Sequence, residues 1–414
     1  MKAVFGRMRS YGRRLKYLLL FLLLFVPARL LRRFHARYRM LWLVAERGYD
    51  ARDNGYRFFS YLTRCQPQIN ACFVISGDSP DREKVTALGK TVESGSLQHH
   101  LMYLAADYLV GTHVQPAAPN PWAYYRMAQY GLRAKGHPVF LQHGIIINDI
   151  KHLHYPRLRI DLFVCGAKPE FEHISAAYGH PAGVVRYLGL SRYDALYGAQ
   201  RREREILLMP TWRSAAYPTG DAFLQTAFYK HYQAFLQSPE LLELLERLDV
   251  RLIFYPHTEL QKELHHFSSP SDRIVLADQA HYDVQTLLLR CLLLITDYSS
   301  VFFDVGYQGK PVIYYQFDEE EYRKYLYAEG YFSYRRDGFG PVVETQEALL
   351  ASLTACAEAG FALPEEYAKR IERFFPMRDD KNCERTYQAI LALSGGGRES
   401  ADCPADRIVS LRGV

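Results

Sequence analysis

The sequence predicts an α/β protein of two parallel-sheet domains that follow a basic, apolar N-terminal segment. The chain of 414 residues is longer than a domain with one compact core, and its 49% hydrophobic residues are enough to form two such cores. From about residue 41 to 390, short apolar runs alternate with longer amphipathic ones, as in parallel α/β domains. We therefore expect a membrane-associating segment over 1–40, domains over 41–200 and 201–393, and a flexible tail over 394–414.

Basic residues are concentrated at the N-terminus. Eleven of the 51 Lys and Arg residues precede the first acid, Glu46, so the rest of the chain has 40 basic and 45 acidic residues. This distribution argues against a nucleic-acid-binding body and for a local anionic partner of the N-terminal segment.

The apolar run from Tyr17 to Ala28 is about a dozen residues long, whereas a spanning helix needs roughly 20. Arg29, Arg32 and Arg33 follow where a signal peptide would have small residues. The pattern favours a helix that lies in the interface of an anionic membrane, peripheral or monotopic. A spanning signal-anchor and a buried helix are the alternatives.

The predicted strands are short and apolar, and several lack alternation, which is typical of strands covered on both faces. They are Met40 to Ala45, Ala71 to Ile75, Tyr108 to Gly111, Pro138 to Gln142, Leu162 to Cys165, Val184 to Tyr187, Glu205 to Met209, Arg251 to Tyr255, Ile274 to Leu276, Leu292 to Thr296 and Pro311 to Tyr315. The predicted helices are Asn54 to Arg64, Lys84 to Leu88, Trp122 to Arg133, Lys168 to Tyr178, Pro239 to Leu248, Val284 to Arg290 and Ser299 to Gln308.

The polar, Arg-rich stretch from Gly198 to Arg204 separates these elements into two units. Two Rossmann-like domains that face each other across a cleft form the glycosyltransferase-B architecture. In open parallel sheets, ligands bind beyond the carboxyl ends of the strands. The candidate functional residues all follow predicted strands.

His143 and Gly144 follow the strand that ends near Gln142. An imidazole titrates near neutral pH and suits a general base, and a glycine lets a substrate approach the backbone. In the second unit, Thr211 and Arg213 follow one strand and His257 follows the next. A guanidinium there offers bidentate donors to phosphate oxygens, with an ordinary surface arginine as the alternative. We expect His257 to be a second catalytic residue that hydrogen-bonds to a diphosphate or, when protonated, neutralises it, with a buried structural histidine as the alternative.

The run from Thr296 through Asp297, Ser299 and Ser300 to Asp304 follows an all-apolar strand. Serine is a favoured N-cap, and a helix N-terminus attracts anions, so we expect this turn to hold a diphosphate without metal. Plain helix capping, with Asp304 as a structural acid, is the alternative.

The seven cysteines lack a C-x-x-C pair, and no histidine cluster has metal-ligand spacing, so the sequence predicts neither a disulfide framework nor a metal or cofactor site.

Several motifs in one order resemble the CDP-glycerol glycerophosphotransferase family, which includes the teichoic acid primases and polymerases. The matching segments are Trp42 to Phe59, Ile69 to Ile75, Gln142-His-Gly, Pro210-Thr-Trp-Arg213, Ile295 to Asp304, Lys310 to Tyr315, Phe317 to Tyr322 and Asp380 to Arg385. The sequence departs from the family after Gly144, where Ile145-Ile-Ile-Asn148 stands in place of the common Thr-Pro-Leu-Lys.

This resemblance implies a glycosyltransferase-B fold, attachment to the cytoplasmic face of the cell membrane, and CDP-glycerol as donor. It implies that His143 activates an acceptor hydroxyl and that Arg213, His257, Ser299 and Ser300 contact the donor phosphates. The acceptor would be a membrane-linked cell-surface polymer of the teichoic-acid or capsule type, or its lipid-linked precursor. A CDP-ribitol or nucleotide-sugar transferase and a non-catalytic envelope-assembly protein are the alternatives.

Overall fold

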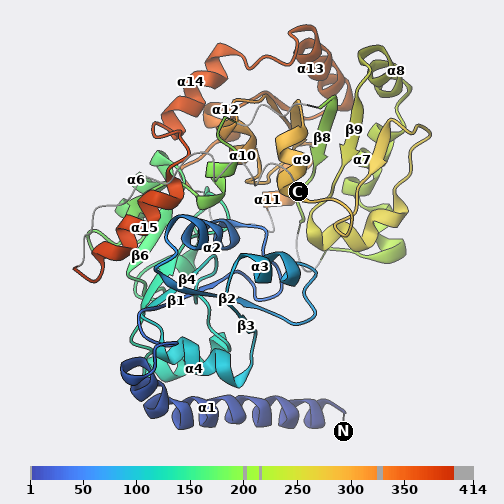
Figure 1. The fold of residues 1–414 in the computed structure, drawn as a ribbon. Helices are drawn as coiled ribbons and strands as arrows, with labels where there is room; N and C mark the ends of the chain where they lie inside the picture. The colour runs from blue at the N-terminus through green and yellow to red at the C-terminus, as the bar shows by residue number, and fades with distance from the viewer. Residues whose placement is uncertain (1, 199–202, 214–216, 324–329, 396–414) are drawn as a thin grey trace.

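The computed structural model describes residues 2–198, 203–213, 217–323 and 330–395, and the side chains from residue 15 onward within these ranges. It contains two parallel β-sheets, each covered by helices on both faces (Figure 1). The predicted boundary at residues 200/201 falls between the two sheets. The two parallel-sheet domains expected from the sequence are therefore confirmed.

The first sheet has seven strands in the order β3-β2-β1-β4-β5-β6-β7, all parallel. The chain enters at the centre with β1, winds outward to β3, and then returns to build the other half. The strands are β1 (Leu41–Ala45), β2 (Asn70–Ile75), β3 (Thr91–Glu93), β4 (Tyr108–Gly111), β5 (His137–Phe140), β6 (Leu162–Cys165) and β7 (Val185–Tyr187).

Alternate side chains of these strands enter different cores, as the period of two requires. Trp42 and Val44 pack on one face under α2 (Asn54–Cys65) and α3 (Arg82–Leu88). Leu41 and Leu43 pack on the other face, which α4 (Leu97–Ala105) and α5 (Pro121–Gln129) cover. Beside β6, α6 (Lys168–Ala177) closes a smaller core.

The second sheet has six parallel strands in the order β10-β9-β8-β11-β12-β13. They are β8 (Glu205–Met209), β9 (Arg251–Phe254), β10 (Ile274–Leu276), β11 (Leu293–Thr296), β12 (Val312–Tyr315) and β13 (Val342–Val343). One face is covered by α7 (Ala227–Leu236), α8 (Pro239–Leu248) and α13 (Gln346–Glu358). The other face carries α9 (Val284–Arg290), α10 (Phe302–Tyr307) and α14 (Glu365–Phe374).

The two domains share buried surface. Ile145, Leu190 and Tyr193 of the first domain belong to the same apolar cluster as Leu207 and Phe302 of the second. The final helix, α15 (Asn382–Ala392), returns to the first domain and packs against Trp42 and Phe58, although the sequence division assigned it to the second (Figure 1). This crossing and the shared cluster hold the two sheets together.

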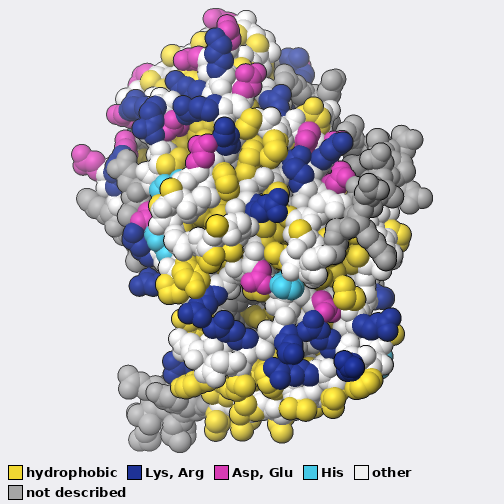
Figure 2. All heavy atoms as spheres, turned by 90° about the vertical axis from the view of Figure 1, so that its left-hand side faces the viewer, with side chains coloured by type: hydrophobic (Ala, Val, Ile, Leu, Met, Phe, Trp, Pro, Cys, Tyr) yellow, Lys and Arg dark blue, Asp and Glu magenta, His cyan; other side chains and the backbone are white. Residues whose placement is uncertain are grey.

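Helix α1 (Lys2–Phe34) lies along the base of the first domain and contacts α4 and α5 (Figure 1). Its Phe21 and Ala28 are buried there, while Leu23 is 71% exposed on the outside. Figure 2 shows hydrophobic side chains gathered along this lower edge, with Lys and Arg side chains directly above. Among the described residues, no helix combines the length and apolar character needed to cross a bilayer.

Four predicted strands, now β4, β6, β8 and β10, have the expected boundaries, and the other predicted strands differ by one or two residues at an end. The sequence pattern did not predict β3, β13 or the helices α4, α7, α13, α14 and α15. It also predicted too early a start for α10. The expected helix from Ser299 begins only at Phe302, because residues 300 and 301 form a turn.

The short connecting elements are the α-helices α11 (Glu319–Arg323) and α12 (Tyr334–Asp337) and the 3-10 helices η1 (Lys151–Leu153), η2 (Ser191–Ala195), η3 (Gly220–Gln225) and η4 (Thr258–His266). Cys72, Cys165, Cys291, Cys356 and Cys383 are free thiols.

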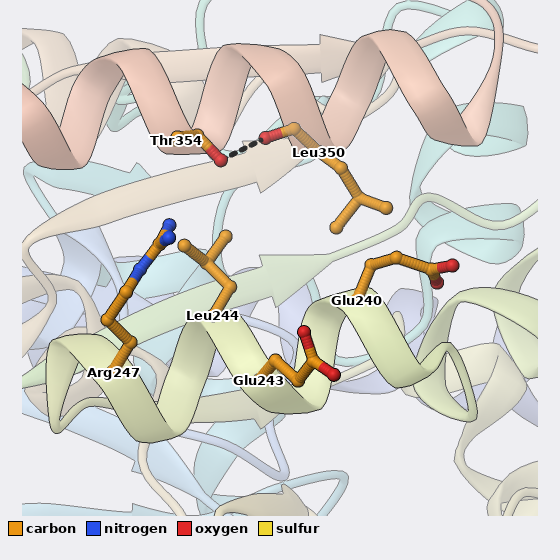
Figure 3. A pocket seen from close by; sticks show the side chains of 6 residues that line it. All are labelled: Glu240, Glu243, Leu244, Arg247, Leu350 and Thr354. Carbon is orange, nitrogen blue, oxygen red and sulfur yellow. Dashed lines mark hydrogen bonds between the residues drawn. The ribbon is translucent and has the colours of Figure 1, made fainter.

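A groove of about 380 Å³ lies between α8 and α13 (Figure 3). Glu240, Glu243, Leu244 and Arg247 line it from α8, and Leu350 and Thr354 from α13. These helices cover the face of the second sheet opposite α10. The groove is therefore separate from the candidate residues that follow the strands.

Candidate active site

The strand order reverses between β1 and β4 in the first sheet and between β8 and β11 in the second. At such a point, neighbouring connections leave in opposite directions and open a place for a ligand beyond the carboxyl ends. Glu46 and Thr112 follow β1 and β4, and Pro210 and Asp297 follow β8 and β11. These four positions mark where each domain is expected to bind its substrate.

Gly144 of the first domain lies directly against Ser300 of the second. A β-carbon at position 144 would lie 2.9 Å from Oγ of Ser300. Real β-carbons do not approach a neighbour this closely, so a side chain at position 144 would have to displace the hydroxyl group of Ser300. The two loops predicted to carry the base and the phosphate-binding turn therefore meet, although 156 positions separate them in the sequence.

His143 sits beside this contact, after a strained residue. Gln142 has a positive φ of 61°, a conformation that is uncommon for a residue with a β-carbon. The ring of His143 is stacked on that of His113, with centroids 5.6 Å apart and planes at 11°. Its side chain is exposed, as a proton acceptor for a substrate must be.

The protein around His143 lowers the pKa of its imidazole from 6.5, mainly by displacing water. The positive charges of Arg192 and Arg47 lower this pKa further, and Asp53 opposes them. Desolvation likewise lowers the pKa of His113, to about 4. Both rings are consequently neutral at pH 7, and a neutral imidazole can accept a proton.

His257 belongs to the same region from the side of the second domain. It follows β9, is exposed, and stacks on Trp212 with ring centroids 6.2 Å apart. Desolvation lowers its pKa, and the charge of Arg47 lowers it further. Because Arg47 also acts on His113 and His143, it lies near histidines of both domains.

Arg213 corrects one expectation about the site. Its guanidinium does not project into the space between the domains, because the side chain is 0% exposed and bonded to Asp297 and Asp318, each at 2.8 Å. Burial by itself would lower the pKa of Arg213, but the two carboxylates raise it, so the residue keeps its charge. Arg213 acts as a buried counter-ion for two acids of its own domain.

Asp297 uses this charge to shape the turn after β11. One carboxylate oxygen accepts hydrogen bonds from the backbone N–H of Thr211 at 2.8 Å and of Tyr298 at 2.6 Å. Thr211 itself is half-buried, and Asp297 is fully buried. The acid therefore ties together the two loops at the switch point, and its carboxylate is turned into the protein.

Thr296 and Asp304 are also occupied within the protein, contrary to the expectation that they bind substrate. The hydroxyl of Thr296 donates to the carbonyl of Met209 at 2.6 Å, and Asp304 forms an ion pair with Arg192. Ser299 and Ser300 remain half-buried. Ser299 accepts from the N–H of Val301 at 3.3 Å, so it caps a turn ahead of α10.

Sequence reasoning missed four polar residues that shape this region: Asp53, His113, Glu170 and Arg192. Glu170 is fully buried and accepts hydrogen bonds from the N–H groups of Ile146 and Gly166, both at 2.7 Å, which fixes the loop after Gly144. His113 follows β4 directly, and its place after a strand was the available signal. Within the ranges that the structure describes, no group of three His, Cys, Asp or Glu side chains is placed to hold a metal ion.

Residues 26–392 match the family model described as CDP-Glycerol:Poly(glycerophosphate) glycerophosphotransferase. This match covers most of the 414 residues, including both sheets and α15. The chain belongs to this family. The description of this family is of glycerophosphotransferases.

Curated relatives of this chain act in teichoic acid synthesis, by their names. The minor teichoic acid biosynthesis protein GgaB of Bacillus subtilis is 29% identical over 85% of this chain and 40% of its own length. The teichoic acid glycerol-phosphate transferase of Staphylococcus aureus is 33% identical over 26% of this chain and 28% of its own length. The chain thus spans less than half the length of these relatives.

Solved structures support the fold of this family member. The wall teichoic acid polymerase TagF is similar over 94% of this chain and 98% of its own, with a TM-score of 0.63 and 18% identity. A TagF variant soaked with CDPG has a TM-score of 0.64 and 17% identity over the same shares. A Staphylococcus aureus MnaA–UDP structure is more distant, with a TM-score of 0.53 and 12% identity. The fold is thus the two-domain glycosyltransferase-B type of TagF.

Proposed function

We propose that this enzyme transfers glycerol phosphate from CDP-glycerol to a hydroxyl of a membrane-linked cell-surface polymer or its lipid-linked precursor, with release of CMP. The observation that carries the proposal is the contact of Gly144 with Ser300. It brings the loop that carries a neutral, exposed imidazole in one domain into contact with the hydroxyl-bearing turn of the other. No cofactor is needed for this reaction.

In the proposed step, the acceptor oxygen attacks the β-phosphorus of CDP-glycerol. The bond between this phosphorus and the bridging oxygen breaks, CMP leaves with that oxygen, and His143 takes the acceptor proton. Such a transfer depends on alignment of the reacting atoms and on stabilisation of charge at the phosphoryl oxygens. His257, Thr211, Ser299 and Ser300 are the accessible groups that would contact the donor phosphates.

Arg213, Thr296, Asp297 and Asp304 have a different role in this proposal. Their polar atoms bind one another or Arg192, so they set the shape of the donor site without contacting the donor. Gly144 contributes space. We assign the first domain to the acceptor and the second to the CDP donor, in keeping with the bases and hydroxyls that each contributes.

We further propose that α1 rests on the cytoplasmic face of the cell membrane. Its outward face carries exposed apolar side chains, namely Leu15, Leu19, Leu22, Leu23, Val26, Leu30 and Phe34. Arg29, Arg33, Arg37 and Arg39 are exposed near the end of this helix. Apolar groups that enter the acyl boundary beside arginines that meet anionic headgroups would hold the enzyme close to a lipid-linked acceptor.

The test is a donor panel with purified protein and synthetic lipid-linked acceptors. CDP-glycerol, CDP-ribitol and UDP-sugars are compared, and released CMP or nucleoside diphosphate is measured. CMP release with CDP-glycerol, reduced about 10²- to 10⁴-fold in His143→Ala, supports the proposal. CMP release with CDP-ribitol alone reassigns the donor. Absence of acceptor-dependent release with every donor contradicts the transferase proposal.

A further inference from the structure

Arg192, in η2 of the first domain, bonds to both domains at the point where their loops meet. Nε and Nη2 donate to the two carboxylate oxygens of Asp304 in α10, at 2.5 and 2.8 Å. Nη1 donates to Asp53, at 2.7 Å, and to the backbone carbonyl of His143, at 2.9 Å. One guanidinium thus joins the backbone of the proposed base to the helix that follows Ser300.

The surroundings of Arg192 allow little freedom. Its side chain is 12% exposed and that of Asp304 is 3% exposed, so water competes weakly for the paired groups. A bidentate pair between a guanidinium and a carboxylate fixes orientation as well as distance, because both planes must align. The pair therefore acts as a rigid link between the two domains.

The same link supports the strained backbone at position 142. The backbone N–H of Arg192 donates to the side chain of Asn54 at 3.0 Å, and that side chain donates to the carbonyl of Gln142 at 2.9 Å. Two successive carbonyls, those of Gln142 and His143, are thereby held by one connected network. A residue with positive φ persists only where its neighbours fix it in this way.

We infer that Arg192 is a positioning residue of the transfer reaction, which holds His143 in register with the donor-binding turn of the second domain through its bonds to Asp304 and to the His143 carbonyl. This inference rests on the proposed function for its kinetic consequences. Arg192 itself touches no reacting atom. A misplacement of a base by about 1 Å can lower a rate by roughly 10²-fold, which sets the expected size of the effect.

The charge of Arg192 gives a readout that a purely structural residue would not move. This charge lowers the pKa of His143, whereas Asp53 raises it. Removing the guanidinium removes the positive charge that lowers this pKa and leaves the negative charge of Asp53, which raises it. The acidic limb of kcat/KM should then shift to higher pH in Arg192→Gln and stay in place in Arg192→Lys, which keeps the charge but loses the planar fork.

The experiment compares Arg192→Gln, Arg192→Lys and Asp304→Asn with wild type, using CMP release from CDP-glycerol at saturating donor. We expect kcat to fall roughly 10²-fold in all three variants, with much smaller changes in KM for the donor. Arg290→Gln is the matched control. It removes an arginine that pairs with Glu203 and Glu205 at the start of β8, away from the loops that meet. Wild-type kcat and an unshifted acidic limb in Arg192→Gln would overturn the inference.

Hydrogen exchange separates this inference from the proposed function. In Arg192→Gln, the amides of residues 142–147 should exchange faster than in wild type, while Arg290→Gln should leave them unchanged. If wild-type protein releases no CMP but these amides respond, the proposed function fails and the link stands. If wild type is active and the amides do not respond in Arg192→Gln or Asp304→Asn, the link is wrong.

Discussion

Gly144 and Ser300 face each other so closely that a β-carbon on the first would lie 2.9 Å from the hydroxyl oxygen of the second. The two residues belong to different domains and follow different strands. Their contact fixes how near the proposed base can come to the proposed phosphate-binding turn. We expect catalysis to be sensitive to atoms added on either side.

The Gly144→Ala variant should lower kcat by up to about tenfold, because the added methyl group displaces the hydroxyl group of Ser300 from its place in the proposed phosphate-binding turn. The measurement is CMP release, combined with a double-mutant cycle with Ser300→Gly. Removing the Ser300 side chain creates room for the methyl group. If the loss of activity in the double variant equals the combined losses of Gly144→Ala and Ser300→Gly, the steric explanation is incorrect.

The pH profile of kcat/KM should have its acidic limb below pH 6.5. A general base works in its neutral form, and desolvation, with help from Arg192 and Arg47, lowers the pKa of His143 from 6.5. The midpoint of the loss of activity should therefore lie below pH 6.5. His257→Gln should retain this limb, although desolvation also lowers the pKa of His257. An acidic limb with its midpoint above pH 6.5 would speak against His143 as the base.

Replacing Arg213 with methionine should lower the free energy of unfolding by about 3–5 kcal/mol, because Asp297 and Asp318 would then be buried acids without a counter-ion. Urea denaturation at pH 7 measures this effect. The control is Arg335→Ala, which breaks an exposed pair with Glu344 and should cost about 1 kcal/mol or less. Equal losses in both variants would contradict the buried ion pair.

Leu19→Glu and Leu23→Glu should reduce binding to anionic lipid vesicles, because each places a charge on the exposed apolar face of α1. Cosedimentation with vesicles that contain phosphatidylglycerol measures the effect, and added salt should weaken the wild-type interaction. Ala351→Glu, at an exposed position of α13, adds the same charge elsewhere and serves as the control. Unchanged binding of both leucine variants would contradict membrane docking through this face.

Strands with continuous apolar runs were predictable because both of their faces are covered, as for β6 and β8. The missed strands β3 and β13 have three and two residues, too few to show a period. Helix α4 was missed because five of its nine residues are buried, including His99 and His100, which hides an amphipathic pattern.

The residues of the candidate site also differ in how far the sequence predicts them. Residue order alone was enough to propose the histidines as candidates, because His143 and His257 stand just after apolar strands, where the structure leaves both exposed. Whether the side chains of Arg213 and Asp304 are buried in ion pairs or open to a substrate depended on their partners. Asp318 lies 105 positions from Arg213, and Arg192 lies 112 positions from Asp304. Sequence patterns do not reveal such distant ion pairs.

By itself, the sequence determined the two-domain α/β class and the family, because short-range periodicity and local motifs encode these properties. Only the tertiary structure decided which polar groups face solvent and which neutralise one another. That decision depends on burial and on the approach of residues from different domains. The contact of Gly144 with Ser300 forms only when both sheets are folded and packed together. The same is true of the ion pairs that Arg192 makes with Asp53 and Asp304.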